Sequence, residues 1–213
     1  MPTPKLVETE DGLALISENL KLIGNYEELL PRIAKNKVLS ERIFKAVKLK
    51  EVEHPIVWDA TAGLGEDSFL LAAAGCMVTQ IEYDDTIFAL LQDAHNRALN
   101  HEKLRDVAQR IRLIHGDNIV WMKEMALQRE KVDVIYLDPM FPVKTKNALT
   151  NKKLQLFQML ESPCATEEEL FWTAKKCQPK KIVVKRPMKG EYLAGQKPNH
   201  SFDGKTVRFD CYL

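Results

Sequence analysis

The chain has 213 residues, of which 45% are hydrophobic, and its formal net charge is +1. This length can bury one full core plus a short appendage, which argues against a second full domain. The longest apolar run, residues 69–78, is far shorter than the roughly 20 residues of a membrane helix, so we expect a soluble, cytoplasmic protein without membrane contact.

Charge is unevenly distributed along the chain. Residues 1–130 carry 16 Lys and Arg against 21 Asp and Glu, whereas residues 131–213 carry 15 against 9. The basic second part is where we expect any polyanionic partner to bind, although surface lysines also serve solubility. The four cysteines include no CxxC pair and the histidines show no metal-ligand spacing, so neither a metal site nor a disulfide framework is predicted.

Residues 1–50 are predicted to form an N-terminal arm with short helices, ahead of a main domain at residues 51–213. Leu13–Ile16 indicates a short strand in an otherwise loosely organised arm. Apolar residues recur at mixed helical spacings from Tyr26 to Leu49, which favours two short helices. Their lysines and arginines form either a solvated helix face or a surface that faces the substrate.

The stretch Val57–Glu82 reads as a strand, a glycine turn, a helix and a second strand. Gly63 and Gly65 allow a sharp turn that exposes backbone N–H groups at a helix N-terminus. Glu82 ends the second strand, where its carboxylate can accept hydrogen bonds from two ribose hydroxyls. Ser68 stands where a third glycine of GxGxxG would fall, so a nucleoside-cofactor turn and a purely structural turn both stay open.

The alternation of helix and strand continues downstream. An amphipathic helix is predicted at residues 85–100, and the strand Arg110–His115 leads into Asp117 and Asn118. In a parallel sheet these side chains lie at the edge where ligands bind, and Asp117 can hydrogen-bond an adenine amino group with Asn118 beside it. An Asx-turn or a helix cap is the alternative.

A further apolar strand, Val132–Leu137, ends in the motif DPMFP. The Asp138 carboxylate and the backbone carbonyls around Pro139, which has no N–H, offer acceptors, while Phe141 offers an aromatic face. This combination suits a planar base that bears an amino group, with a simple strand-ending turn as the alternative. Lys181–Lys185 is predicted to be a central strand, and the last residues an antiparallel edge strand that follows a turn at Asp203 and Gly204.

Four strand ends therefore gather polar residues on one edge. We predict an α/β fold of the class I S-adenosylmethionine (SAM) methyltransferase type, Rossmann-like, with a mostly parallel sheet, an antiparallel edge strand and a short N-terminal helical appendage. A NAD-linked oxidoreductase would share the first two sites but would not need the DPMFP motif. A methyltransferase that acts on another RNA, a protein or a small molecule would also fit the pattern, as would a non-catalytic RNA-binding protein.

Several motifs resemble those of the RsmJ family of bacterial small-subunit (16S) ribosomal RNA guanine-N2 methyltransferases. They are DATAGLGEDSFLLAAAGC, LIHGDN, YLDPMFPVKTKNALTNKKLQLFQ, VVKRP and RFDCY, spread over residues 55–213. The resemblance implies SAM as cofactor and ribosomal RNA or the small ribosomal subunit as partner. By motif position it implies these cofactor residues: Glu66, Asp67, Glu82, Tyr83, Asp117, Asn118 and Asp138.

The chemistry of guanine N2 suggests a mechanism, because its lone pair is delocalised into the ring. Asp138 and the Pro139 carbonyl are predicted to accept its two hydrogens, and Phe141 to stack on the base. Basic residues nearby are predicted to hold RNA phosphates, namely Lys144, Lys146, Lys152, Lys153, Lys185 and Arg186.

Overall fold

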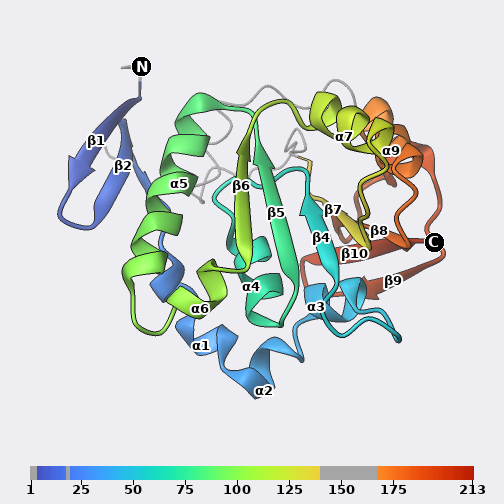
Figure 1. Ribbon diagram of the computed structural model, residues 1–213, viewed down its shortest axis with the longest axis horizontal. Helices are drawn as coiled ribbons and strands as arrows, with labels where there is room; N and C mark the ends of the chain where they lie inside the picture. The colour runs from blue at the N-terminus through green and yellow to red at the C-terminus, as the bar shows by residue number, and fades with distance from the viewer. Residues whose placement is uncertain (1–3, 18–19, 140–166) are drawn as a thin grey trace.

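The computed structural model describes residues 4–17, 20–139 and 167–213. Within these ranges the chain forms a seven-stranded sheet of order β6-β5-β4-β7-β8-β10-β9 and a separate three-stranded sheet (Figure 1). The strands of the large sheet are β4 (Ile56–Asp59), β5 (Met77–Glu82), β6 (Ile111–His115), β7 (Val134–Leu137), β8 (Lys181–Pro187), β9 (His200–Asp203) and β10 (Val207–Tyr212).

The pairing within the large sheet confirms the predicted fold class. Strands β4 to β8 are parallel, and β10 runs antiparallel to both β8 and β9. The predicted antiparallel edge is therefore present, and it includes β9, an outermost strand that was not predicted from the sequence. The order reverses between β4 and β7, which in open α/β sheets is where ligands bind at the carboxyl ends of the strands.

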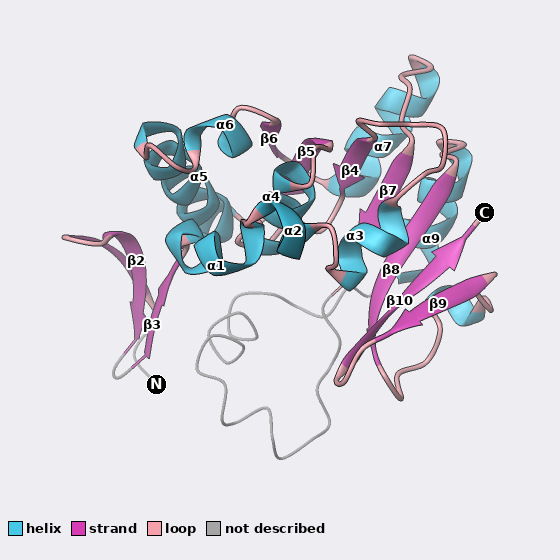
Figure 2. Cartoon of the chain, turned by 90° about the horizontal axis from the view of Figure 1, so that it is seen from below, coloured by secondary structure: helices cyan, strands magenta, loops and turns pink. Residues whose placement is uncertain are grey.

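Helices cover both faces of this sheet (Figure 2). One face carries α3 (Arg42–Val47), α4 (Glu66–Ala73) and α6 (Arg105–Ala108), and the other carries α7 (Asn118–Leu127) and α9 (Glu167–Lys176). Because side chains alternate along a strand, Val57 and Tyr136 pack on the α4 side while Trp58 and Ile135 pack on the α7 side. This alternation decides which side chains of the strand ends can meet.

The N-terminal residues are more ordered than predicted. Strands β1 (Lys5–Thr9), β2 (Gly12–Ser17) and β3 (Leu20–Ile23) form an antiparallel sheet that packs on α5 (Asp85–Asn100) through β2 (Figure 1). The strand predicted at residues 13–16 is confirmed, but the loosely organised arm is wrong. Most of β1 is exposed, so its sequence carries no alternating apolar pattern to reveal it.

The segment between the two sheets contains more helical turns than predicted. It consists of η1 (Tyr26–Leu29), α1 (Leu30–Ile33), α2 (Lys35–Val38) and α3, and a further 3-10 turn, η3 (Leu193–Gly195), precedes β9. Tyr26 and Leu29 enter the core beside α4. Of the helices that the structure describes, none combines the length and the apolar character needed to cross a membrane.

Candidate active site at the carboxyl ends of the sheet

The glycine turn connects β4 to α4 and is braced from within the protein. Gly63 and Gly65 have φ of 55° and 73°, the left-handed region that glycine occupies without strain. The Tyr26 hydroxyl donates to the carbonyl of Leu64 over 3.0 Å, and the Gln80 amide donates to that of Gly65 over 3.2 Å. Sequence reasoning missed both braces, since neither lies in the turn.

Glu82 joins the end of β5 to this turn. Its Oε2 accepts from the Gly63 amide, and its Oε1 accepts from the amides of Tyr83 and Asp84, each over 2.9 Å. Burial raises the pKa of Glu82, against the lowering effect of these three amides. The predicted ribose acceptor therefore lies beside the glycine turn, and the exposed Tyr83 follows it in the chain.

Asp117 and Asn118 connect the end of β6 to the same edge. Asp117 is the N-cap of α7 and accepts from the amide of Val120 over 2.8 Å, as the helix-cap interpretation expected. The Asn118 side-chain amide donates to the carbonyl of Ala60, at the start of the glycine turn. The pair thus supports this edge of the sheet, and its contact with adenine stays a prediction.

Asp138 lies at the end of β7, in an ion-pair cluster. Lys185 Nζ is 2.9 Å from Asp138 Oδ2 and 2.7 Å from Asp67 Oδ2, and the Tyr136 hydroxyl donates to the same Asp67 oxygen over 2.7 Å. The Thr61 hydroxyl accepts from the Asp138 amide over 2.6 Å, which fixes the end of β7 against the glycine turn. Elements far apart in the sequence therefore converge on one carboxylate.

The two acids of this cluster differ in their electrostatics. Desolvation raises the pKa of Asp138 and outweighs the attraction of the Lys185 ammonium. For Asp67, burial alone would raise the pKa, but Lys185 and the Tyr136 hydroxyl together hold it below its ordinary value. Asp67 is thus the firmer anion of the two.

A third acid, Asp59, lies beneath the turn with only 1% of its surface exposed. Ser68 donates to its Oδ2 over 2.5 Å and the amide of Thr61 to its Oδ1 over 3.1 Å. Burial raises its pKa to about 7. Ser68, at the place of the missing third glycine, therefore serves to hold Asp59.

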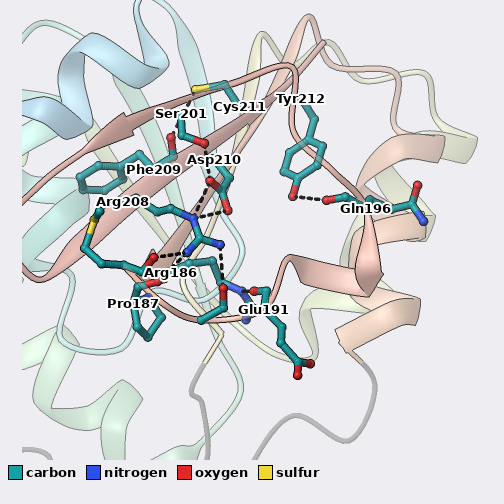
Figure 3. A network of polar contacts seen from close by, with 12 residues as sticks. Arg186, Pro187, Glu191, Gln196, Ser201, Arg208, Phe209, Asp210, Cys211 and Tyr212 are labelled. Atoms are coloured by element: carbon teal, nitrogen blue, oxygen red, sulfur yellow. Dashed lines mark hydrogen bonds and ion pairs between the residues drawn. The ribbon is translucent and has the colours of Figure 1, made fainter.

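The contacts of Lys185 and Arg186 do not fit their predicted role as phosphate contacts. Lys185 is engaged by two carboxylates, and the Arg186 side chain is only 3% exposed. Arg186 pairs with Glu167 over 3.1 Å. It also donates to the carbonyl of Glu191 over 2.8 Å (Figure 3). Both charges form ion pairs within the protein. Consecutive residues of a central strand point to opposite faces of the sheet, and each face is covered by a layer of helices.

Arg208 fixes the segment that follows β8 at the same edge. Its guanidinium pairs with Asp210 over 2.9 Å and donates to the carbonyls of Pro187, Met188 and Gly190 over 2.8–2.9 Å (Figure 3). The sequence motif RFDCY resembled the family without showing this function. Of the other predicted residues, Phe141, Lys144, Lys146, Lys152 and Lys153 lie outside the described residues.

Comparison with known proteins decides between the candidate functions. Residues 24–213 match the family model described as "Putative SAM-dependent methyltransferase". The chain belongs to the SAM-dependent methyltransferase family. This confirms the cofactor and the reaction type that the strand ends predicted, and sets aside the NAD-linked oxidoreductase.

Relatives of this methyltransferase carry a more specific description. The chain is 40% identical to the Ribosomal RNA small subunit methyltransferase J of Neisseria meningitidis, over 95% of this chain and 80% of the relative. It is also 40% identical to the protein of that name from Thioalkalivibrio sulfidiphilus, over 85% of this chain and 71% of the relative.

Solved structures agree with the fold. A SAM-dependent methyltransferase from Neisseria gonorrhoeae matches with a TM-score of 0.79 and 36% identity, over 100% of this chain and 85% of that one. An rRNA methyltransferase from Streptomyces viridochromogenes matches with a TM-score of 0.52, over 84% and 82% of the two chains, and at 13% identity it shows the fold alone.

The residues at this edge suit SAM, which carries a sulfonium and an ammonium group. Asp67 and Asp138 place two carboxyl groups on the ammonium of Lys185, and Asp59 lies close enough for the charges of both to raise its pKa, so this edge suits a positively charged ligand. In the part of the chain that the structure describes, no group of three or more His, Cys, Asp or Glu side chains is placed to hold a metal ion.

Proposed function

We propose that this methyltransferase transfers a methyl group from SAM to the exocyclic N2 of a guanine in small-subunit (16S) ribosomal RNA. The names of its relatives support ribosomal RNA as the substrate class. The observation that carries the proposal is the Asp138 carboxylate, held at the end of a central strand beside the glycine turn by Thr61 and Lys185.

Asp138 and Pro139 provide acceptors suited to an amino group. When bound, SAM supplies an electrophilic methyl group on its sulfonium. In the proposal, the Asp138 carboxylate and the Pro139 carbonyl accept the two N2 hydrogens, which draws the nitrogen out of conjugation and stabilises its developing positive charge. The guanine must be unpaired or flipped out of a helix to reach these acceptors.

The other proposed roles follow from position. Gly63, Gly65, Glu82 and Tyr83 are proposed to hold the nucleoside part of SAM, with Glu66, Asp67, Asp117 and Asn118 as further cofactor contacts. Phe141 is proposed to stack on the base, and the lysines of the segment after it to hold phosphates.

The experiment is methyl transfer from labelled SAM to ribosomal RNA from cells that lack the modification, followed by mapping of the labelled nucleotide. We expect label on one guanine N2, and turnover lost in Asp138→Ala. Asp106→Asn, which changes an exposed aspartate of α6, is the control and should turn over normally. Label on another atom or another type of molecule refutes the N2 assignment, and near-normal turnover of Asp138→Ala refutes the mechanism.

A further inference from the structure

Lys185 links two elements at the point where the proposed reaction takes place. It lies on β8, one residue beyond the pair formed by Leu137 and Val184, and therefore level with Asp138 on the neighbouring strand. Its ammonium is within 2.9 Å of both Asp138 and Asp67, and its side chain is 26% exposed. The ammonium of Lys185 is thus already paired with two carboxylates, which makes it a poor phosphate contact.

We propose that Lys185 is a positioning residue, which keeps the Asp138 carboxylate ionised and oriented to receive a proton from the acceptor nitrogen. The inference rests on the proposed function and assigns Lys185 to the methyl-transfer step instead of phosphate binding. The ion pair holds Oδ2 of Asp138 and so restrains the carboxylate, and in the proposal Oδ1 receives the proton.

The atom balance of the reaction requires such a base. The acceptor nitrogen forms a bond to the methyl carbon as the carbon–sulfur bond breaks, and the bonding electrons remain on sulfur. The nitrogen then carries one hydrogen too many, and that proton passes to the Asp138 carboxylate and from there to water. A protonated Asp138 cannot receive it.

The surroundings show why Asp138 needs a cation to stay ionised. The charged and titratable groups that influence this cluster are Asp67 of α4, Tyr136 of β7, Asp59 of β4, Arg186 of β8 and Arg32 of α1. The two oxygens that Lys185 bridges, on Asp67 and Asp138, both lie within 2.9 Å of one nitrogen. Without the ammonium, two partly desolvated carboxylates would face each other, and one would take up a proton at a higher pH than it does beside Lys185.

The test compares Lys185→Met, which removes the charge, with Lys185→Arg, which keeps it. The control is Lys180→Met, which removes a Lys–Asp pair of similar length, 2.9 Å to Asp133, at the opposite edge of the sheet. For each protein, kcat and KM for RNA are measured from pH 6 to 9.5 at saturating SAM, and SAM affinity is measured by calorimetry.

We expect kcat of Lys185→Met to fall at least 20-fold at pH 7 and to recover as the pH rises, with the acidic limb of the profile shifted upward by one pH unit or more. KM for RNA should change less than threefold, and Lys185→Arg should restore most of kcat. An unshifted limb, or a raised KM with a flatter salt dependence, overturns the proposal in favour of a phosphate contact.

A second readout does not depend on activity. Carboxyl carbon NMR of aspartate-labelled protein, recorded without RNA or SAM, should show one carboxyl that titrates at higher pH in Lys185→Met than in the wild type. Adding Asp67→Asn to that variant should return the titration of Asp138 toward its original pH. If this titration does not move, the proposal on Lys185 fails even when guanine N2 is methylated; if it moves but the RNA label lies elsewhere, the proposed function fails and the ion-pair role of Lys185 stands.

Discussion

Gly65→Ala tests whether the glycine turn needs its packing as well as its backbone conformation. Gly65 has φ of 73°, and a Cβ there would lie within 2.7 Å of side-chain atoms of Gln80, Tyr26 and Leu91. Gly195 offers a matched control, since its φ is 64° and a Cβ added there would meet nothing within 4 Å. The two substitutions share the backbone cost and differ in crowding.

The expected costs follow from these environments. An alanine in the left-handed region costs about 1–2 kcal/mol, which is all that Gly195→Ala should lose. Overpacking in a dense core adds about 1–3 kcal/mol at Gly65, and weakening the hydrogen bonds from Tyr26 and Gln80 adds about 0.5–1.5 kcal/mol each. Gly65→Ala should therefore lose about 3–8 kcal/mol in total, a large share of the 5–15 kcal/mol typical of a domain.

Urea unfolding of both variants measures the free energies of unfolding, and calorimetry measures SAM affinity. We expect Gly65→Ala to bind SAM at least tenfold more weakly, because the turn must shift to make room for the alanine Cβ. Gly195→Ala should bind SAM normally. Equal loss of stability in the two variants would show that crowding at Gly65 is absent and that the braces from Tyr26 and Gln80 do not constrain the turn.

Three further predictions concern buried charge. The pKa of Asp59 is about 7 in the folded protein against 3.8 unfolded, so between these values the folded state holds a proton that the unfolded state has lost. The protein therefore loses about 4 kcal/mol of stability as the pH rises from 4 to 8. Asp59→Asn, which mimics the protonated form, should flatten this dependence in urea unfolding at pH 5 and 8. Lys181, 7% exposed, donates to two backbone carbonyls at the end of α3. By the same method, Lys181→Met should lower the free energy of unfolding by about 2–4 kcal/mol, against less than about 1 kcal/mol for Lys180→Met, which changes an exposed lysine. Equal losses would show that the hydrogen bonds of Lys181 do not stabilise the fold. Glu82→Gln places an NH2 group against backbone donors, so SAM should bind about tenfold more weakly in calorimetry, and unchanged affinity would remove Glu82 from the site.

The sequence allowed the fold and the site edge to be predicted because strand ends are local features. Apolar runs that stop at Glu82, Asp117 and Asp138 show where each strand ends, and parallel topology brings those ends together. No long-range information was needed for that step. Strands β1 and β9 were missed because exposed strands lack the apolar alternation that reveals buried ones.

Lys185 shows what a local pattern leaves out. A basic pair after an apolar strand is typical of a phosphate contact, yet alternation along β8 sends Lys185 toward α4 and Arg186 toward α9. The acids that pair with these two side chains are Asp67 of α4 and Glu167 of α9, and the packing of those helices on the sheet places them there. Side chains alternate between the two faces of a sheet along a strand, so the sequence alone would have placed Lys185 and Arg186 on opposite faces.

The glycine turn is shaped by residues that lie on either side of it in the sequence. Tyr26 comes from the N-terminal segment and Gln80 from β5, and both carry hydrogen bonds to carbonyls of the turn, while Glu82 binds one of its amides. Since α4 begins at this turn without a side-chain cap, the turn owes its conformation to these contacts and to its glycines. The N-terminal segment around Tyr26 thus supports the turn that we propose to hold the cofactor, and changes there should alter SAM binding through the turn.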